Sequence, residues 1–373
     1  MMADFPLLKD MIDRPLVEQI ADRMAVVHPV YDRDGFLRSV MAALESMELK
    51  QRFAWVADKL REYLPADYPT ALAILVEILN DTDGRFAPIE DAGFRLLPIP
   101  TFVYRHGLDH LEASLDAIYV ITRHTSCEGA IRPYIIHHPQ ATLARLQQWA
   151  LDENEHVRRL VSEGSRPRLP WWPQLTDLIA DPAPTLALLE QLKDDPSLYV
   201  RRSVANHLND IGKDHPDRLL ARMEAWAIGA GDERLWLINH ALRTLVKRGD
   251  QRALAILGYG SPAVELSKLK LEPSILPFGE EIEFSFRLRN LDDEPQNLMI
   301  DFVAHFRKAN GSTAPKVFKL KKMRLPSGET ATIVKRLAVR PISTRKYYPG
   351  RQRLEIQVNG RVLGGADFEL VMN

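Results

Sequence analysis

The chain has 373 residues, of which 46% are hydrophobic and 27% are charged, and a single cysteine, Cys127. This length suits two or three domains, and the lone cysteine excludes an internal disulfide and a multi-cysteine metal site. The net charge of −1 hides an asymmetry. Residues 268–373 hold 19 Lys and Arg against 12 Asp and Glu, a balance of +7, which leaves −8 for the rest. A basic tail on an acidic body indicates an anionic partner, although a solvated β surface has the same composition.

Membrane and secretory signals are not evident in the sequence. No uncharged apolar run approaches the ~20 residues that a membrane span needs. The first residues also lack a basic region followed by an apolar run, the pattern of a secretory signal. We therefore expect a cytoplasmic monomer with no membrane partner.

The first 120 residues predict helices joined by short loops. Residues 32–64 carry apolar side chains at helical spacing, and a proline ends the pattern at position 65. Residues 70–79 are almost wholly apolar, which indicates a fully buried helix. We expect the prolines of 98–100 to interrupt the helical pattern before a further helix that includes 108–115.

An internal repeat follows, from about residue 117 to 257. The sequence VRRL at 157–160 returns as VRRS at 200–203, and TLA at 142–144 returns as TLA at 185–187. Both matches have the same offset, 43 residues, which is the period of two-helix HEAT units. Equivalent positions of stacked helical repeats form a column on one surface, so we expect one face to carry Glu128, Glu163, Asn206 and Asn239.

Helical spacing extends this face within each repeat. Arg159 lies four residues before Glu163, and Arg202, Asn206 and Asp210 follow one another at intervals of four. Such positions point the same way on a helix. A solvated row of surface ion pairs would show the same spacing, and each pair would then contribute only a few tenths of a kcal/mol.

The segment 166–173, RPRLPWWP, lies between the two copies and is too rigid and too aromatic for a plain linker. Its Trp171-Trp172 pair, between two prolines, offers an apolar wall for an aromatic cation or a sugar. The alternative is that one of the two tryptophans belongs to the core and the other to the surface.

After residue 260 the periodicity changes from helix to strand. Residues 281–289 alternate polar and apolar side chains, as a half-buried strand does. Turn signals occur at 310–311, 326–328 and 359–360. Further strands are expected at 298–306, 317–320, 330–339, 353–358 and 366–371. The sequence thus predicts a mostly α protein. A HEAT-like helical-repeat solenoid, 1–260, precedes a small antiparallel β-sandwich of immunoglobulin-like type, 261–373.

Two segments carry a more specific resemblance: RRLVSEGSRPRLPWW at 158–172 and VRRSVANHLNDIGKDHP at 200–216. Both resemble the AlkC branch of the AlkC/AlkD family of DNA alkylation-repair glycosylases. The resemblance covers the helical region to about Leu257, and the β region resembles the immunoglobulin-like extension of a subset of that branch. A generic HEAT scaffold has no reason to keep this polar run, so both motifs are specific.

The resemblance implies excision of cationic N3-alkylated bases from duplex DNA, chiefly 3-methyladenine, with 3-methylcytosine as a second candidate. It implies hydrolysis of the N-glycosidic bond without full base flipping, unlike most enzymes that act on a base in a duplex. An N3-alkylated purine is already a cationic leaving group, so little general-acid help is needed. The transition state resembles an oxocarbenium sugar, which a nearby carboxylate stabilises.

The resemblance also implies roles for individual residues. The family's acidic cluster corresponds to Glu128, Glu163 and Asp210, and its aromatic contact to Trp171 or Trp172. Asn206 departs from the column of carboxylates, so it receives no catalytic role. Four arginines are expected to hold the DNA backbone beside the lesion: Arg159, Arg166, Arg168 and Arg202.

The β region supplies a second set of basic residues. Lys319, Lys321 and Lys322 form a run with neighbouring cations, and Arg345-Lys346 precedes two tyrosines. We expect these residues to grip the duplex. Removal of the domain near Ser261 is then expected to reduce activity through DNA affinity.

Other chemistries fit the sequence less well. It contains no GxSxG, P-loop or GxGxxG arrangement, and its histidines lack a metal-ligand spacing, so we expect neither metal nor cofactor. Cys127 is expected to be a small buried residue, and no lysine suggests Schiff-base chemistry, so lyase activity is not expected. The alternative function is a non-catalytic HEAT-repeat scaffold that binds nucleic acid or protein.

Overall fold

The computed structural model describes residues 7–80, 84–86, 88–89, 92–343 and 345–372. The chain divides into two compact units. The first contains Met1–Asp214 and Asp232–Ala241, and the second contains His215–Gly231 and Leu242–Asn373. Each unit has its own core.

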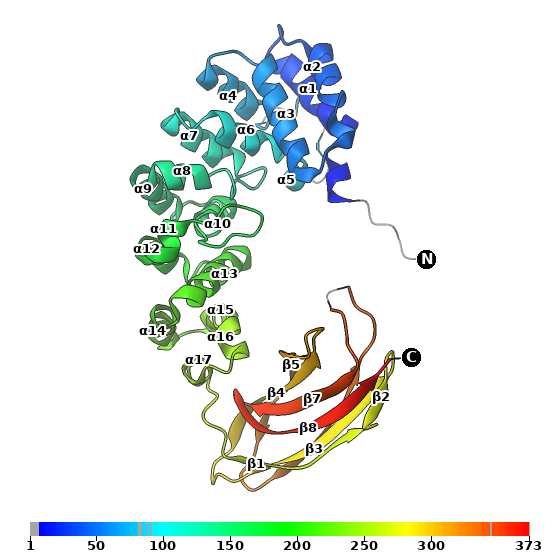
Figure 1. Cartoon of the computed structure of the whole chain (residues 1–373). Helices are drawn as coiled ribbons and strands as arrows, with labels where there is room; N and C mark the ends of the chain where they lie inside the picture. Colours follow the sequence, from blue (N-terminus) through cyan, green and yellow to red (C-terminus); the bar gives the residue numbers. More distant parts are fainter. Residues whose placement is uncertain (1–6, 81–83, 87, 90–91, 344, 373) are drawn as a thin grey trace. The chain divides into compact units, whose positions relative to one another are not determined.

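The first unit is helical throughout the residues described (Figure 1). Its helices up to the start of the repeat are η1 (Leu8–Met11), α1 (Arg14–Val27), α2 (Arg33–Met41), η2 (Leu44–Ser46), α3 (Leu49–Tyr63), α4 (Tyr68–Glu77), α5 (Ala92–Arg95), α6 (Pro98–His106) and α7 (Leu111–Ile121). Those of the repeat are α8 (Arg132–His137), α9 (Pro139–Trp149), α10 (Glu155–Gly164), α11 (Thr176–Ala180), α12 (Ala183–Leu192), α13 (Leu198–Asp214) and α15 (Asp232–Ala241).

The internal repeat appears as two rows of helices. Helix α10 packs on α13, and α13 packs on α15, while α9 packs on α12 behind them. Asn154 caps α10 by accepting a hydrogen bond from the backbone N–H of His156 at 2.9 Å. Apolar residues of both helices bury one stripe, including Val157 and Leu160 of α10 and Val204 of α13. The repeats therefore stack α10 beside α13, each with buried polar residues at the contact.

Three predictions for the first 120 residues are wrong in detail. The helical pattern of 32–64 is divided into α2 and α3, because Glu48 and Gln51 form a capping box that starts a new helix. The prolines of 98–100 open α6, since the first turn of a helix lacks intrahelical N–H partners and tolerates proline. The helix predicted at 70–79 is present as α4, but it is not fully buried: Ala71, Leu72 and Leu75 are buried, whereas Ala73 and Glu77 are exposed.

The second unit joins three helices to a β-sandwich. The helices are α14 (Pro216–Ala227), α16 (Arg243–Lys247) and α17 (Gln251–Ile256). The strands are β1 (Val264–Glu272), β2 (Ile275–Pro277), β3 (Glu281–Asn290), β4 (Gln296–Arg307), β5 (Thr313–Leu325), β6 (Thr330–Ala338), β7 (Gly350–Val358) and β8 (Arg361–Val371).

The strands form two sheets, ordered β1-β3-β6 and β2-β8-β7-β4-β5. Their inner faces meet in a core that includes Phe284, Phe302 and Ile356, and each such side chain stabilises the fold by about 1.5–3 kcal/mol. Asn359-Gly360, both at positive φ, form the two-residue turn between β7 and β8. The short β2 pairs with β8 in parallel, whereas the other pairs named here are antiparallel.

A bulge shapes the edge strand β5. Phe318, Leu320, Met323 and Leu325 pack on the core, and the register against β4 shifts at Leu320, because Ile300 pairs with Lys321 whereas Asp301 pairs with Lys319. The shift leaves an outward row of exposed cations: Lys319, Lys321, Lys322 and Arg324.

The predicted fold class, a helical repeat followed by a two-sheet β-sandwich, is confirmed. Strands β1 and β2 were not predicted, because a bulge at Ser267–Lys270 interrupts the alternation of β1 and β2 is only three residues long. Across the ranges given above, no helix has the length and apolar character needed to span a bilayer.

Candidate functional site

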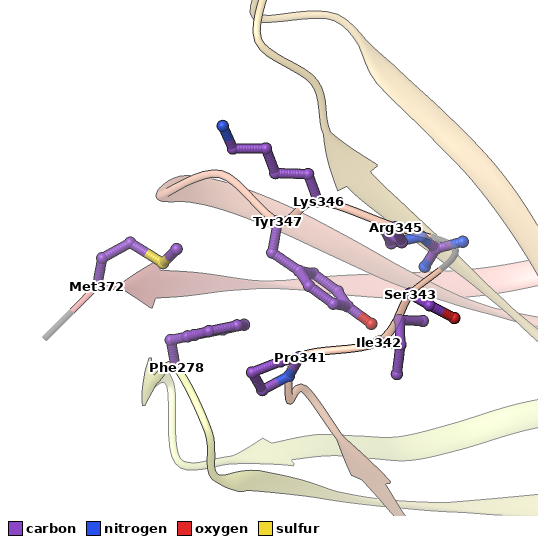
Figure 2. Close-up of a pocket in the computed structure, with 8 residues that line it drawn as sticks. All are labelled: Phe278, Pro341, Ile342, Ser343, Arg345, Lys346, Tyr347 and Met372. Atoms are coloured by element: carbon purple, nitrogen blue, oxygen red, sulfur yellow. The ribbon is translucent and has the colours of Figure 1, made fainter. Parts of the chain in front are cut away.

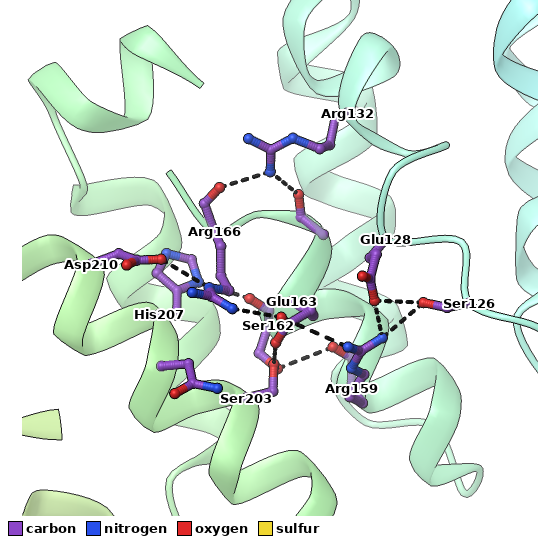
Figure 3. Close-up of polar contacts among 12 residues, drawn as sticks. Ser126, Glu128, Arg132, Arg159, Ser162, Glu163, Arg166, Ser203, His207 and Asp210 are labelled. Atoms are coloured by element: carbon purple, nitrogen blue, oxygen red, sulfur yellow. Dashed lines mark hydrogen bonds and ion pairs between the residues drawn. The ribbon is translucent and has the colours of Figure 1, made fainter. Parts of the chain in front are cut away.

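Carboxylates from three separate segments meet around two arginines in the first unit. Helix α10 supplies Arg159 and Glu163, and Arg166 follows its last turn. Glu128 comes from the segment between α7 and α8, and Asp210 comes from α13. Figure 3 shows the five side chains turned toward one another. The predicted assembly of Glu128, Glu163 and Asp210 in one place is therefore present in the structure.

Charges of opposite sign alternate through this cluster. Arg159 contacts Glu128 at very short range and lies 3.7 Å from Glu163 Oε1. Arg166 bridges the other two carboxylates, with Nη1 2.7 Å from Glu163 Oε1 and Nε 2.9 Å from Asp210 Oδ2. Lys213 completes the row 2.7 Å from Asp210 Oδ1. Each carboxylate is thus paired with at least one cation.

The three carboxylates of the cluster differ in solvent exposure, from partly exposed to buried. The exposed side-chain fraction is 25% for Glu128, 9% for Glu163 and 2% for Asp210. Burial lowers the pKa of Arg159 and of Arg166, but the adjacent carboxylates outweigh it and raise both pKa values above the ordinary range. Removing one partner from such a buried pair leaves an uncompensated charge, at a cost of about 3–5 kcal/mol.

The two cluster arginines do not lie where a phosphate would reach them freely. Arg159 and Arg166 have exposed side-chain fractions of only 15% and 10%, and the carboxylates occupy their guanidinium groups. Arg202 is exposed on α13, and Arg168 is paired with Asp214 at the surface. The four arginines predicted to hold DNA therefore fall into two groups, two inside the network and two outside it.

A fully buried arginine, Arg132 at the start of α8, was not predicted from the sequence. Its Nη1 donates to the carbonyls of Gly164 at 2.9 Å and Arg166 at 2.7 Å, and its Nε donates to that of Pro173 at 3.0 Å. Burial, followed by repulsion from Arg166, lowers the pKa of Arg132 to about 10. The guanidinium thereby fixes both ends of the segment 166–173.

The two tryptophans of that segment have different environments. The Trp172 ring meets Tyr104 edge to face at 5.8 Å and lies so close to Gly129 that a Cβ there would clash with it. Trp171 is 60% exposed, and its backbone has a φ of 72°. A bulky residue in this left-handed region is strained, and such strain is found mainly at functional sites. Lys50 Nζ donates to the Trp171 carbonyl.

The basic residues of the second unit also have distinct settings. Lys319, Lys321 and Lys322 lie in the outward row on β5. Arg345 lies over the Phe306 ring, 4.4 Å from its centroid, and Lys346 lies 5.6 Å from the Tyr348 ring. Both belong to an open cavity of about 590 Å³, in which Tyr347 points toward Phe278 and Pro341 (Figure 2).

The buried state of Cys127 agrees with the prediction of a small structural residue. It is fully buried, and burial raises the pKa of its thiol far above the ordinary range. Among the residues that the structure describes, no group of three His, Cys, Asp or Glu side chains could hold a metal ion.

Two family models match the chain. A model described as "DNA alkylation repair enzyme" matches residues 121–244, and one described as "Uncharacterised protein YhaZ, C-terminal Ig-like domain" matches residues 265–372. The first match contains the whole carboxylate–arginine cluster. The second covers the β-sandwich and identifies it as immunoglobulin-like.

Two full-length relatives extend these matches. The protein YhaZ of Bacillus subtilis strain 168 is 37% identical over 371 residues, which are 99% of this chain and 100% of the relative. The solved structure of Pseudomonas fluorescens alkylpurine DNA glycosylase AlkC, bound to DNA containing an abasic site analog, is 41% identical. It has a TM-score of 0.89 and covers 98% of this chain and 100% of that one.

The fold, the cluster and these matches define a helical-repeat DNA-repair enzyme with an immunoglobulin-like extension. The chain belongs to the AlkC branch of the AlkC/AlkD family of DNA alkylation-repair glycosylases. The alternative of a non-catalytic scaffold is accordingly set aside.

Proposed function

We propose that this protein hydrolyses the N-glycosidic bond of cationic N3-alkylated bases in duplex DNA, chiefly 3-methyladenine, with 3-methylcytosine as a second substrate. The observation that supports this most is the convergence of Glu128, Glu163 and Asp210 around two arginines. The Pseudomonas fluorescens relative is an alkylpurine DNA glycosylase, which supports the same class of substrate.

The charge on the substrate explains why this cluster suits the reaction. DNA phosphates repel carboxylates, so a cluster of three is useful beside DNA only where positive charge appears. The alkylated base is cationic before reaction, and the deoxyribose acquires oxocarbenium character as the bond breaks. Preorganised carboxylates then stabilise the transition state electrostatically. Because the alkylated base leaves as a neutral molecule, the reaction needs no strong general acid.

The residues take separate roles in this proposal. Glu163 and Glu128, the more exposed carboxylates, face the sugar and orient the attacking water, and Asp210 adds negative potential from behind. Arg159 and Arg166 pair with the carboxylates and hold them in place, while Arg202 and Arg168 contact the phosphate backbone. Trp171, the exposed tryptophan, provides the aromatic contact with the lesion.

Three finer features belong to the same proposal. The base is excised without full flipping, so the site acts on the sugar and the backbone side of the nucleotide. Water, and not a lysine amine, attacks C1′ of the sugar. The product is therefore an unbroken strand with an abasic site. The outward cations of β5, with Arg345 and Lys346, supply a second contact with the duplex.

Base release from methylated duplex DNA tests this function. The purified protein is incubated with the duplex, and free bases and strand breaks are measured separately. Release of 3-methyladenine with an intact, alkali-labile strand is the expected result. Binding of the duplex without base release would reject the proposal.

A further inference from the structure

Two buried hydroxyls lie behind the Glu163 carboxylate. Ser203 Oγ on α13 donates to Glu163 Oε2 at 2.7 Å, and Ser162 Oγ on α10 lies 2.7 Å from Ser203 Oγ (Figure 3). Ser162 is 0% exposed and Ser203 is 3% exposed. The two repeats therefore meet in a short chain of hydroxyls that ends on one oxygen of the proposed catalytic carboxylate.

The chemistry of the groups fixes the direction of this chain. An ionised carboxylate only accepts hydrogen bonds, so the single Ser203 proton points to Glu163. The Ser203 oxygen is then free to accept, and Ser162 donates to it. Ser162 has a second acceptor in reach, the Arg159 carbonyl at 3.1 Å, and its own carbonyl accepts from His207 Nδ1 at 2.9 Å.

The two oxygens of Glu163 are thus held by different kinds of donor. Cations hold Oε1, with Arg166 at 2.7 Å and Arg159 at 3.7 Å. A neutral hydroxyl holds Oε2. A neutral donor orients this oxygen without adding positive charge that would oppose a cationic transition state. Held from both sides, the carboxylate has no freedom to rotate about its Cγ–Cδ bond.

We propose that Ser203, supported by Ser162, is a positioning residue that sets the orientation of the Glu163 carboxylate during base excision. The proposal rests on the function proposed above. Electrostatic stabilisation depends on preorganisation, so a carboxylate that has lost one of its holding donors stabilises the oxocarbenium sugar less well. Both serines act through Glu163 and do not touch the DNA.

A double-mutant cycle with Glu163 tests the proposal. Single-turnover excision of 3-methyladenine is measured for Ser203→Ala, Glu163→Gln and the double variant, with affinity for undamaged duplex and Tm measured in parallel. Loss of one hydrogen bond to a charged group is expected to slow excision by Ser203→Ala about 10-fold. Its DNA affinity stays unchanged, and Ser203→Thr, which keeps the hydroxyl, restores most of the rate.

The double variant separates positioning from a general loss of packing. If Ser203 acts through the Glu163 charge, Ser203→Ala causes no further loss in the Glu163→Gln background. The matched control is Ser165→Ala, which removes another buried hydroxyl. Among the residues that the structure describes, that hydroxyl bonds the Val161 carbonyl alone, at 2.6 Å, so the parental rate is expected.

The results of these experiments distinguish the positioning role of Ser203 from the catalytic role of Glu163. A normal rate for Ser203→Ala beside a slow Glu163→Gln overturns the positioning role and leaves the proposed function intact. An equal loss from Ser203→Ala in both backgrounds also overturns it, because the effect is then structural. A normal rate for Glu163→Gln rejects the catalytic assignment itself, and the positioning role is rejected with it.

Discussion

Asp210 and Glu128 differ in how they reach the substrate, so their neutral variants are expected to differ as well. Asp210 is 2% exposed and holds Arg166 and Lys213, whereas Glu128 is 25% exposed and holds Arg159. Asp210→Asn removes charge from the buried end and releases Arg166. We expect it to lower single-turnover excision by about 10²-fold, the scale of one lost electrostatic stabiliser.

Glu128→Gln keeps a hydrogen-bonding group at the exposed end, where water screens the lost charge, so a smaller loss of excision rate is expected. Affinity of both variants for undamaged duplex should stay equal or rise, because an arginine loses its carboxylate partner. Excision at the parental rate by Asp210→Asn would show that its buried charge is structural only.

His207 makes the stability of the first unit sensitive to acid. It is fully buried, and burial lowers its pKa to about 4. An unfolded histidine titrates near pH 6.5. Between pH 6.5 and 4 the unfolded chain therefore binds a proton that the folded chain does not. The corresponding stability is present above pH 6.5 and is lost as the pH falls toward 4, by up to about 3 kcal/mol.

The variant His207→Asn isolates this effect. Asparagine keeps an N–H for the Ser162 carbonyl but does not titrate. It leaves a small cavity and lowers stability at every pH, but the difference in unfolding free energy between pH 7.5 and pH 5 should shrink. Urea denaturation at both pH values measures that difference. An unchanged difference would show that His207 is not the titrating group.

The charged residues of the site could be predicted from the sequence, but the residues that support them could not. Arg159 and Glu163 share a helix face, and the second repeat placed Asp210 on an equivalent helix. Ser203 and Arg132 act through contacts with residues 40 and 32 positions away, to Glu163 and Gly164. Serine and arginine are common on helices, and no local pattern marks a partner that far along the chain.

At the scale of elements, the segment 166–173 is the part of the site that depends most on its neighbours. The segment forms neither helix nor strand. Hydrogen bonds from Arg132 to the carbonyls of Arg166 and Pro173 hold its two ends. A lysine cannot replace this guanidinium, because three carbonyls in different directions need the planar fork of donors. The prolines of the sequence indicated rigidity but not which tryptophan is exposed.

The two tryptophans are expected to respond differently to truncation. Trp171→Ala removes a side chain that is 60% exposed and keeps the Cβ that strains this backbone position, so Tm should stay nearly constant while excision slows. Trp172→Ala removes the ring that packs on Tyr104 and Gly129, so Tm should fall by several degrees. Thermal denaturation beside single-turnover excision compares them. A lower Tm for Trp171→Ala with an unchanged rate would reverse the assignment.

At the scale of the whole molecule, composition indicated an anionic partner for the C-terminal region before any fold was considered. Periodicity in the sequence predicted both the helical repeat and the β-sandwich. A repeat of 43 residues indicated the first, and the alternation of polar and apolar residues indicated the second. The break between α2 and α3 and the helix at Pro98 were missed, since caps and first-turn prolines decide them over a few residues. The domain boundary at 260 stays a prediction.

The row of cations on β5 is expected to contribute to the salt dependence of DNA binding. Each phosphate contact adds about 0.9 to the slope of log affinity against log salt. Replacing Lys319, Lys321 and Lys322 by alanine should therefore lower that slope by roughly two to three. Lys59→Ala is the control, because Lys59 is already paired with Glu62 at 2.7 Å. Equal slopes for the triple variant and the parent would exclude this row from the DNA interface.

The proposed function requires above all that the Glu163 carboxylate acts in breaking the N-glycosidic bond. Single-turnover release of 3-methyladenine from methylated duplex, by the parent and by Glu163→Gln, measures it most directly. We expect the parent to release the base and leave an abasic site, and Glu163→Gln to do so about 10²-fold more slowly with undiminished DNA affinity. Equal rates for the two proteins would exclude Glu163 from catalysis, and no release by the parent would reject the proposed function.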